Sequence, residues 1–127
     1  MTWRWLRPDT AEAVHQEQLA EHRGGDGVRD HGALLSALAR PQNLAAYGEP
    51  DAAALAAAYA FGIAKNHPFI DGNKRTAWVL ARLFLMKNGK TLNFKDAEAV
   101  VAMLALAASD LTEDELADWF RERIRPT

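Results

Sequence analysis

The chain has 127 residues, a net charge of −2 and no cysteine. This is the size of a single domain, and it excludes a disulfide framework, a thiolate metal site and a cysteine nucleophile. Alanine accounts for 25 residues, whereas valine and isoleucine together account for eight. That excess of the best helix former predicts an all-α fold, a compact bundle of five to seven helices forming one domain over residues 1–127.

The N-terminal part of the sequence predicts an extended lead-in followed by one helix. Residues 3–6 are aromatic and basic and carry no helix-start signal. Asp9 or Thr10 then offers a side-chain oxygen to the unpaired amides of a helix that ends near His22. The glycines of residues 24–27 stop this helix, because glycine tolerates the left-handed conformations of a tight turn.

Two further helices are predicted on either side of a surface loop. Asp30 is placed to cap a short second helix. Residues 40–50 contain two prolines and a glycine, which predicts a loop or irregular hairpin. Residues 51–66 form the next helix, whose apolar run is too short to span a bilayer of about 30 Å. We expect a buried helix and no membrane partner. The arginines among the N-terminal tryptophans do not fit a signal peptide, so a cytoplasmic protein is expected.

The second half of the sequence predicts three more helices. The proline and glycine of residues 67–72 prevent the preceding helix from continuing. Helices are expected over residues 73–88 and 97–107, the first of them ended by an Asn-Gly pair. The last helix has the clearest start, since residues 112–115 carry the threonine and glutamate of a capping box. The loops 40–50 and 67–72 are therefore the expected places for function.

The chemically informative residues lie together in the segment HPFIDGNKRTAW, residues 67–78. Gly72 permits a close backbone approach, and the first amides of the helix that begins at Asn73 have no partners within it. Such a helix start binds anions, most naturally phosphate. Lys74 and Arg75 add positive donors suited to phosphate oxygens.

Two residues of the same segment supply metal and acid–base chemistry. Asp71 would be repelled by bare phosphate but becomes favourable as an oxygen ligand of Mg²⁺ shared with phosphates. His67 can take a proton from a hydroxyl near neutral pH, since the ordinary histidine pKa is about 6.5. Phe69 is predicted to anchor the loop in the core. These residue types describe a nucleotide-dependent transfer to a hydroxyl, with His67 as general base.

A purely structural interpretation of this segment is open as well. Histidine before proline and Asp-Gly are both common in turns, and a Lys-Arg pair is often just solvated. However, Lys74 and Arg75 sit where the helix dipole disfavours cations. A local conflict of that kind is expected at a functional site.

HPFIDGNKRTA closely resembles the signature of the Fic/Doc superfamily, and specifically of its death-on-curing (Doc) branch, the toxins of toxin–antitoxin pairs. The segments GGDGVRD at 24–30, RPQNLAAYG at 40–48 and LARLFLMKNGKTL at 80–92 are similar to this family too, so the resemblance covers nearly the whole chain. It implies the Fic/Doc fold, with residues 40–48 as a flap that aligns a target segment by strand-like pairing. Asn43 and Tyr47 are the expected target contacts; alternatively, Tyr47 only covers the core.

The resemblance also implies a reaction. Fic enzymes that transfer AMP to protein hydroxyls show HPFxxGNGRxxR, whereas Lys74 here replaces the second glycine and Trp78 the final arginine. Doc toxins share this NKR variant and are protein kinases that use ATP to phosphorylate a threonine of elongation factor Tu, which halts translation. The sequence therefore favours transfer of the γ-phosphate, with ATP and Mg²⁺ as cofactors. The expected catalytic residues are His67, Asp71, Lys74 and Arg75, and the expected ATP-binding residues are Gly72, Asn73, Lys74 and Arg75.

Other functions are weighed beside this one. An AMP transferase with an altered motif is the nearest alternative, and an inactive family member is a third possibility. A nucleic-acid-binding module is an alternative of another class, because residues 65–95 carry +6, although residues 96–120 carry −7. The aromatic residues of that basic segment occupy core-like positions, which disfavours base stacking and a direct nucleic-acid partner. The resemblance further implies an antitoxin whose helix docks in an apolar groove edged by Trp3, Trp5 and Trp119.

Overall fold

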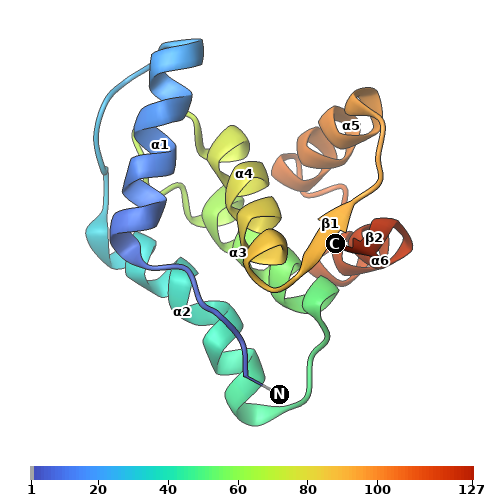
Figure 1. Cartoon of the computed structure of the whole chain (residues 1–127). Coiled ribbons are helices and arrows are strands. Elements are labelled where there is room, and N and C mark those ends of the chain that lie inside the picture. The colour runs from blue at the N-terminus through green and yellow to red at the C-terminus, as the bar shows by residue number, and fades with distance from the viewer. Residues whose placement is uncertain (1) are drawn as a thin grey trace.

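Six helices make up most of the chain in the computed structural model, which describes residues 2–127 (Figure 1). Two short strands are the other regular elements, and they pair antiparallel. The predicted all-α fold is confirmed, although this small sheet was not predicted. The elements are α1 (Pro8–His22), α2 (His31–Tyr47), α3 (Ala52–Asn66), α4 (Asn73–Lys87), β1 (Lys90–Leu92), α5 (Asp96–Ala107), α6 (Glu113–Arg123) and β2 (Ile124–Pro126).

The alanine-rich helix α3 lies at the centre and packs against α2, α4 and α6. The Asp51 side chain caps its start, as it accepts a hydrogen bond from the Ala54 N–H at 2.9 Å. Small residues let the neighbouring helices approach closely. A Cβ added to Gly62 would lie 3.1 Å from the Cα of Ala37, so α2 contacts the α3 backbone directly at this point.

The N-terminal segment is extended, as predicted, and its contacts hold it on the core. The Leu6 N–H donates to the buried Tyr59 hydroxyl at 3.0 Å. The rings of Trp3 and Trp5 lie 6.0 and 5.9 Å from the ring of Phe84 in α4. This segment therefore joins α3 to α4.

The predicted cap of the first helix is wrong. Arg7 occupies the cap position of α1 without a side-chain cap bond, and Pro8 is the first helical residue. Asp9 instead accepts from the Arg7 Nε at 3.1 Å and from the Thr10 N–H at 2.9 Å. Proline fits the first turn because its missing N–H would have no helical partner there.

The predicted loop over residues 40–50, and with it a flap loop at 40–48, is also wrong. Asp30 caps α2 as expected, but the helix continues through Pro41 to Tyr47 and leaves only residues 48–51 irregular. Proline inside a helix forfeits one backbone hydrogen bond and crowds the preceding turn, at a cost of about 3 kcal/mol. Burial against α3 offsets that cost, because Pro41 continues the buried stripe of Leu34, Ala37 and Leu38.

The C-terminal part closes the bundle beside α3. The predicted capping box of α6 is confirmed: Thr112 Oγ1 accepts from the Glu115 N–H at 3.1 Å, and Glu115 Oε1 accepts from the Thr112 N–H at 2.9 Å. Arg121 of α6 pairs with Asp51 at 2.7 Å, which ties the end of α6 to the start of α3.

Within the described residues, every helix is too short or too polar to cross a membrane.

Candidate active site

The loop 67–72 connects the C-terminus of α3 to the N-terminus of α4, so the predicted site residues do lie around one turn. His67 is exposed and ends α3 in the left-handed conformation, with φ 49° and ψ 55°. Such a conformation costs a non-glycine residue about 1–3 kcal/mol. Gly72 precedes α4 with φ 77°, a value that glycine adopts readily.

Phe69 and Asn73 fix the middle of this loop. The Phe69 side chain is 1% exposed and stacks on His15 of α1, with a centroid distance of 3.9 Å. Asn73 Oδ1 accepts from the Phe69 N–H at 3.1 Å, and Asn73 Nδ2 donates to the Phe69 carbonyl at 3.0 Å. The Asn73 side chain therefore supports the loop, whereas its backbone amide belongs to the helix start.

Asp71 is exposed beside the helix start, and both its side chain and its backbone carbonyl make hydrogen bonds. Its Oδ1 accepts from the Gly72 N–H at 2.8 Å, and its backbone carbonyl lies 2.8 Å from His15 Nε2. A Cβ added to Gly24 would lie 2.7 Å from Asp71 Oδ2, so a larger residue there would displace this carboxylate. One exposed carboxylate beside an anion site suits Mg²⁺, which binds through one or two carboxylates together with substrate phosphates.

The start of α4 presents donors rather than acceptors. Within residues 2–127 the backbone amides of Asn73, Lys74 and Arg75 have no acceptor, as expected for a helix N-terminus. Lys74 is exposed, whereas Arg75 is half-buried and its Nε is buried without a hydrogen-bond partner. The free helix amides and the positive charges of Lys74 and Arg75 match the acceptor oxygens of a phosphate.

Trp78, one turn beyond Lys74, packs in an aromatic cluster. Its ring lies 5.1 Å from Phe94 and 5.9 Å from Trp119, and the guanidinium of Arg82 lies 5.7 Å from its centroid. The position that carries the final arginine of the AMP-transferring pattern is thus occupied by packing between α4 and α6.

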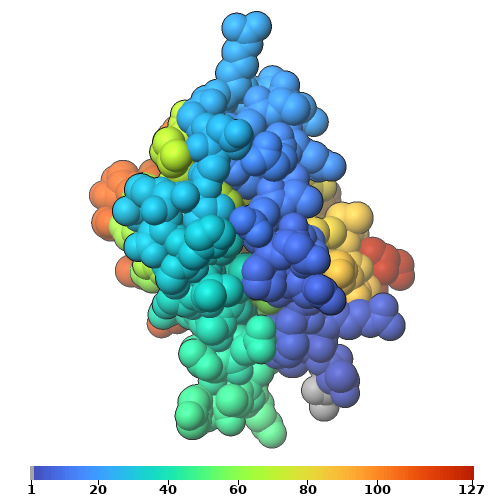
Figure 2. Space-filling model, turned by 90° about the vertical axis from the view of Figure 1, so that its left-hand side faces the viewer, coloured from blue at the N-terminus to red at the C-terminus, as the bar shows by residue number. Residues whose placement is uncertain are grey.

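The segment before α2 closes over the loop 67–72, a contact that sequence reasoning did not foresee. Backbone bonds join Ile70 to Gly27 at 3.2 Å and Arg29 to Pro68 at 2.7 Å. The Arg29 side chain donates to main-chain carbonyls at the end of α3. In Figure 2 the yellow-green atoms of the loop emerge beside the light-blue segment that precedes α2. The only advance signals were the family-like sequence of residues 24–30 and the place of His15 on the apolar face of α1.

The expected target contacts, Asn43 and Tyr47, line a groove of about 670 Å³ on α2. Asn66, the neighbour of His67, lines the same groove. Tyr47 is 92% exposed, so it does not cover the core. The groove thus connects the C-terminal part of α2 to the site.

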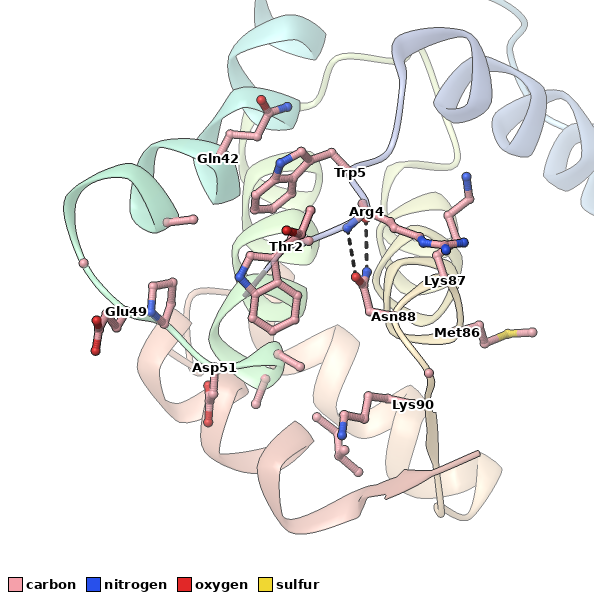
Figure 3. Close-up of a pocket in the computed structure, with 18 of the residues that line it drawn as sticks. Thr2, Arg4, Trp5, Gln42, Glu49, Asp51, Met86, Lys87, Asn88 and Lys90 are labelled. Carbon is pink, nitrogen blue, oxygen red and sulfur yellow. Dashed lines mark hydrogen bonds between the residues drawn. The ribbon is translucent and has the colours of Figure 1, made fainter.

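A hollow of about 1600 Å³ lies at the opposite end of α3 and α4 from the site (Figure 3). Trp3 and Trp5 line it, and Arg4 and Asn88 exchange two hydrogen bonds at its edge. Trp119 belongs to the aromatic cluster of Trp78 and is not part of this lining. The three tryptophans therefore do not edge one groove.

Comparison with known proteins agrees with this geometry. The family model described as the Fic/DOC family matches residues 5–85, which include the whole 67–78 motif. The protein kinase doc of Escherichia phage P1 is 31% identical over 119 residues, covering 93% of this chain and 94% of that protein. The toxin Doc of Mycolicibacterium smegmatis is 42% identical over 95 residues, covering 71% and 72%. With its helical fold and this loop, the chain belongs to the Fic/Doc family, in its Doc branch.

Proposed function

We propose that this protein is the toxin of a toxin–antitoxin pair and a cytoplasmic protein kinase. In this proposal it transfers the γ-phosphate of ATP to a threonine or serine hydroxyl of a translation factor, elongation factor Tu, and so inhibits translation. The observation that carries the proposal is the juxtaposition of an exposed histidine, an exposed carboxylate and an unsatisfied helix start around one loop. The names of the two relatives, a protein kinase and a toxin, support it.

Each residue of the site has a role in this reaction. His67 takes the proton from the target hydroxyl as the hydroxyl oxygen bonds to the γ-phosphorus. The bond from that phosphorus to the β–γ bridging oxygen breaks, and ADP leaves with the electron pair. Arg75 and the amides that follow Gly72 hold phosphate oxygens and neutralise charge in the transition state. Lys74 adds an exposed positive charge at the same helix start.

Asp71 is the residue that would hold Mg²⁺. A metal ion held there would supply positive charge against the negative charge of the phosphates. The fit rests on a single exposed carboxylate next to helix amides that have no acceptor within residues 2–127. This protein's own part is to orient Asp71, through the Gly72 amide and the contact of its carbonyl with His15.

Two positions favour phosphate transfer over AMP transfer. Lys74 places a long side chain where the AMP-transferring pattern has glycine and leaves room for phosphates. Trp78 occupies the position of an arginine, and its ring packs against Phe94 and Trp119. Both residues therefore depart from the pattern with which AMP-transferring enzymes hold a triphosphate.

The proposal includes two protein partners. The target segment lies in the groove on α2, with Asn43 and Tyr47 as contacts. A helix of the cognate antitoxin docks in an apolar groove, for which the hollow lined by Trp3 and Trp5 is the candidate. Four basic residues line that hollow against two acidic ones, Glu49 and Asp51, an excess of positive charge that would favour an acidic helix.

The test compares ATP labelled on the α- or γ-phosphate, with wild type and His67→Ala incubated with purified elongation factor Tu. We expect label from the γ position only, a phosphate-sized mass gain on the target, and loss of both in the variant. Because His67 is exposed, alanine leaves no cavity. Label from the α position would establish AMP transfer instead. The two proteins are also expressed in a bacterial host, and equal arrest of its growth by wild type and His67→Ala would remove His67 as the base.

A further inference from the structure

We propose that Arg29 is the residue that positions His67 for catalysis, an inference that rests on the proposed role of His67 as general base. Arg29 lies 38 residues before His67 in the sequence, in the segment that precedes α2. Its Nε donates to the His67 carbonyl oxygen at 2.7 Å, and its Nη2 donates to the Asn66 carbonyl oxygen at 2.9 Å. These carbonyls lie on the two sides of His67, so one guanidinium fixes both neighbouring peptides.

His67 needs such support because its backbone is strained and its ring is free. The residue adopts φ 49° and ψ 55° although it has a Cβ. Within residues 2–127 no side chain or backbone group hydrogen-bonds the His67 ring. The direction in which the side chain leaves the main chain is therefore set by the His67 backbone. Strained conformations of this kind persist only when neighbouring contacts over-determine them.

The chemistry of the contact favours arginine over lysine. The last carbonyls of α3 have no partners within the helix and form the negative end of its dipole, so a cation there is favourable. The planar guanidinium reaches both carbonyls at once, whereas an ammonium acts as a single charged point. The Arg29 main chain reinforces the contact, since its N–H donates to the Pro68 carbonyl at 2.7 Å.

A merely structural role makes a different prediction. The Arg29 side chain is exposed, so its removal leaves neither a cavity nor a buried charge, and water can solvate the freed carbonyls. Stability would then change little and turnover would stay the same. If Arg29 positions His67, turnover falls while ATP binding persists, because the hydrogen bonds of Arg29 described above go to the end of α3 and to Pro68, not to the α4 start where phosphates are proposed to bind.

The experiment measures kcat and the KM for ATP in Arg29→Ala and Arg29→Lys at saturating target. Arg125→Ala is a matched control, as Arg125 is exposed and donates to the Glu122 and Ile124 carbonyls at 3.2 and 2.8 Å, far from the loop in sequence. We expect kcat to fall about 10- to 100-fold in Arg29→Ala, with the lysine variant between it and wild type. The KM for ATP should stay within about two-fold. An unchanged kcat in Arg29→Ala, or an equal fall in Arg125→Ala, would overturn the proposal.

A second measurement separates failure of this inference from failure of the proposed function. The ¹³C chemical shifts of His67 Cα and Cβ report its backbone conformation without any ATP. We expect the left-handed signature in wild type and Arg125→Ala, and its loss in Arg29→Ala. If wild type transfers no phosphate but these shifts change as expected, the proposed function fails and the positioning contact stands. Identical shifts in Arg29→Ala and wild type would sink the positioning contact itself.

Discussion

Replacing Asn73 by alanine is expected to destabilise the whole domain through the loop 67–72. The Asn73 side chain is 8% exposed and exchanges bonds of 3.1 and 3.0 Å with the Phe69 main chain. Alanine leaves a buried N–H and a buried carbonyl unpaired, at a combined cost of about 2–6 kcal/mol. The entropy of unfolding is about 2.1 cal/mol/K per residue. Over 127 residues that cost corresponds to a fall in Tm of about 8–22 °C.

Asn88 provides a matched control for this loss. It brackets the Arg4 main chain in the same way, with bonds of 2.9 and 3.1 Å, but at an exposed site where water can replace them. It also donates to the Phe84 carbonyl at 2.8 Å, so Asn88→Ala removes one bond more. Thermal unfolding followed by circular dichroism compares the two variants. The reasoning is refuted if Asn73→Ala melts within about 3 °C of wild type, or if Asn88→Ala loses as much.

Three further predictions follow from single contacts. Gly24→Ala should slow Mg²⁺-dependent transfer at least about ten-fold, because the added Cβ displaces Asp71. Gly89→Ala should not, because Gly89 also has a positive φ but no atom lies within 4 Å of the added Cβ. The transfer rate measured over a range of Mg²⁺ concentrations compares the two variants. Tyr47→Ala should raise the KM for the protein target with Tm unchanged, because the side chain is 92% exposed; an unchanged KM would remove Tyr47 from the target groove. Burial raises the pKa of Tyr59, so its stabilising effect is complete below about pH 10 and is lost as the pH rises through the folded-state pKa. Urea unfolding between about pH 9 and 11 should show this fall in wild type and not in Tyr59→Phe.

Helices whose signals are local could be predicted from the sequence. Asp51 before an alanine run specified the start of α3, and the capping box specified the start of α6. The loop predicted at Pro41 was wrong because the rule against proline in helices describes an isolated helix. Here burial of Pro41 stabilises α2 on both sides of this residue. The strands β1 and β2 have three residues each, and their pairing depends on packing that brings residues far apart in the sequence together.

The candidate site likewise contains residues that the sequence could identify and residues that only the fold brings to it. His67, Asp71 and Gly72 could be found because the chemistry is contiguous in the sequence and spans a helix boundary. Arg29 and His15 could not be assigned a role, since each acts through main-chain carbonyls of the loop. The bonds that reveal them join residues 38 and 56 positions apart. A backbone carbonyl leaves no trace in the sequence, so such contacts require the fold.

The unfavourable features of this chain gather around one loop. His67 is left-handed, Lys74 and Arg75 oppose the dipole of α4, and the buried Arg75 Nε has no partner. Each costs stability by itself. A ligand with phosphate oxygens would reverse the cost of placing Lys74 and Arg75 against the dipole, because it brings negative charge to the helix start. Binding of a nucleotide should therefore raise the free energy of unfolding. Lys74 and Arg75 lower the stability of the free protein, and the bound phosphates would remove that destabilisation.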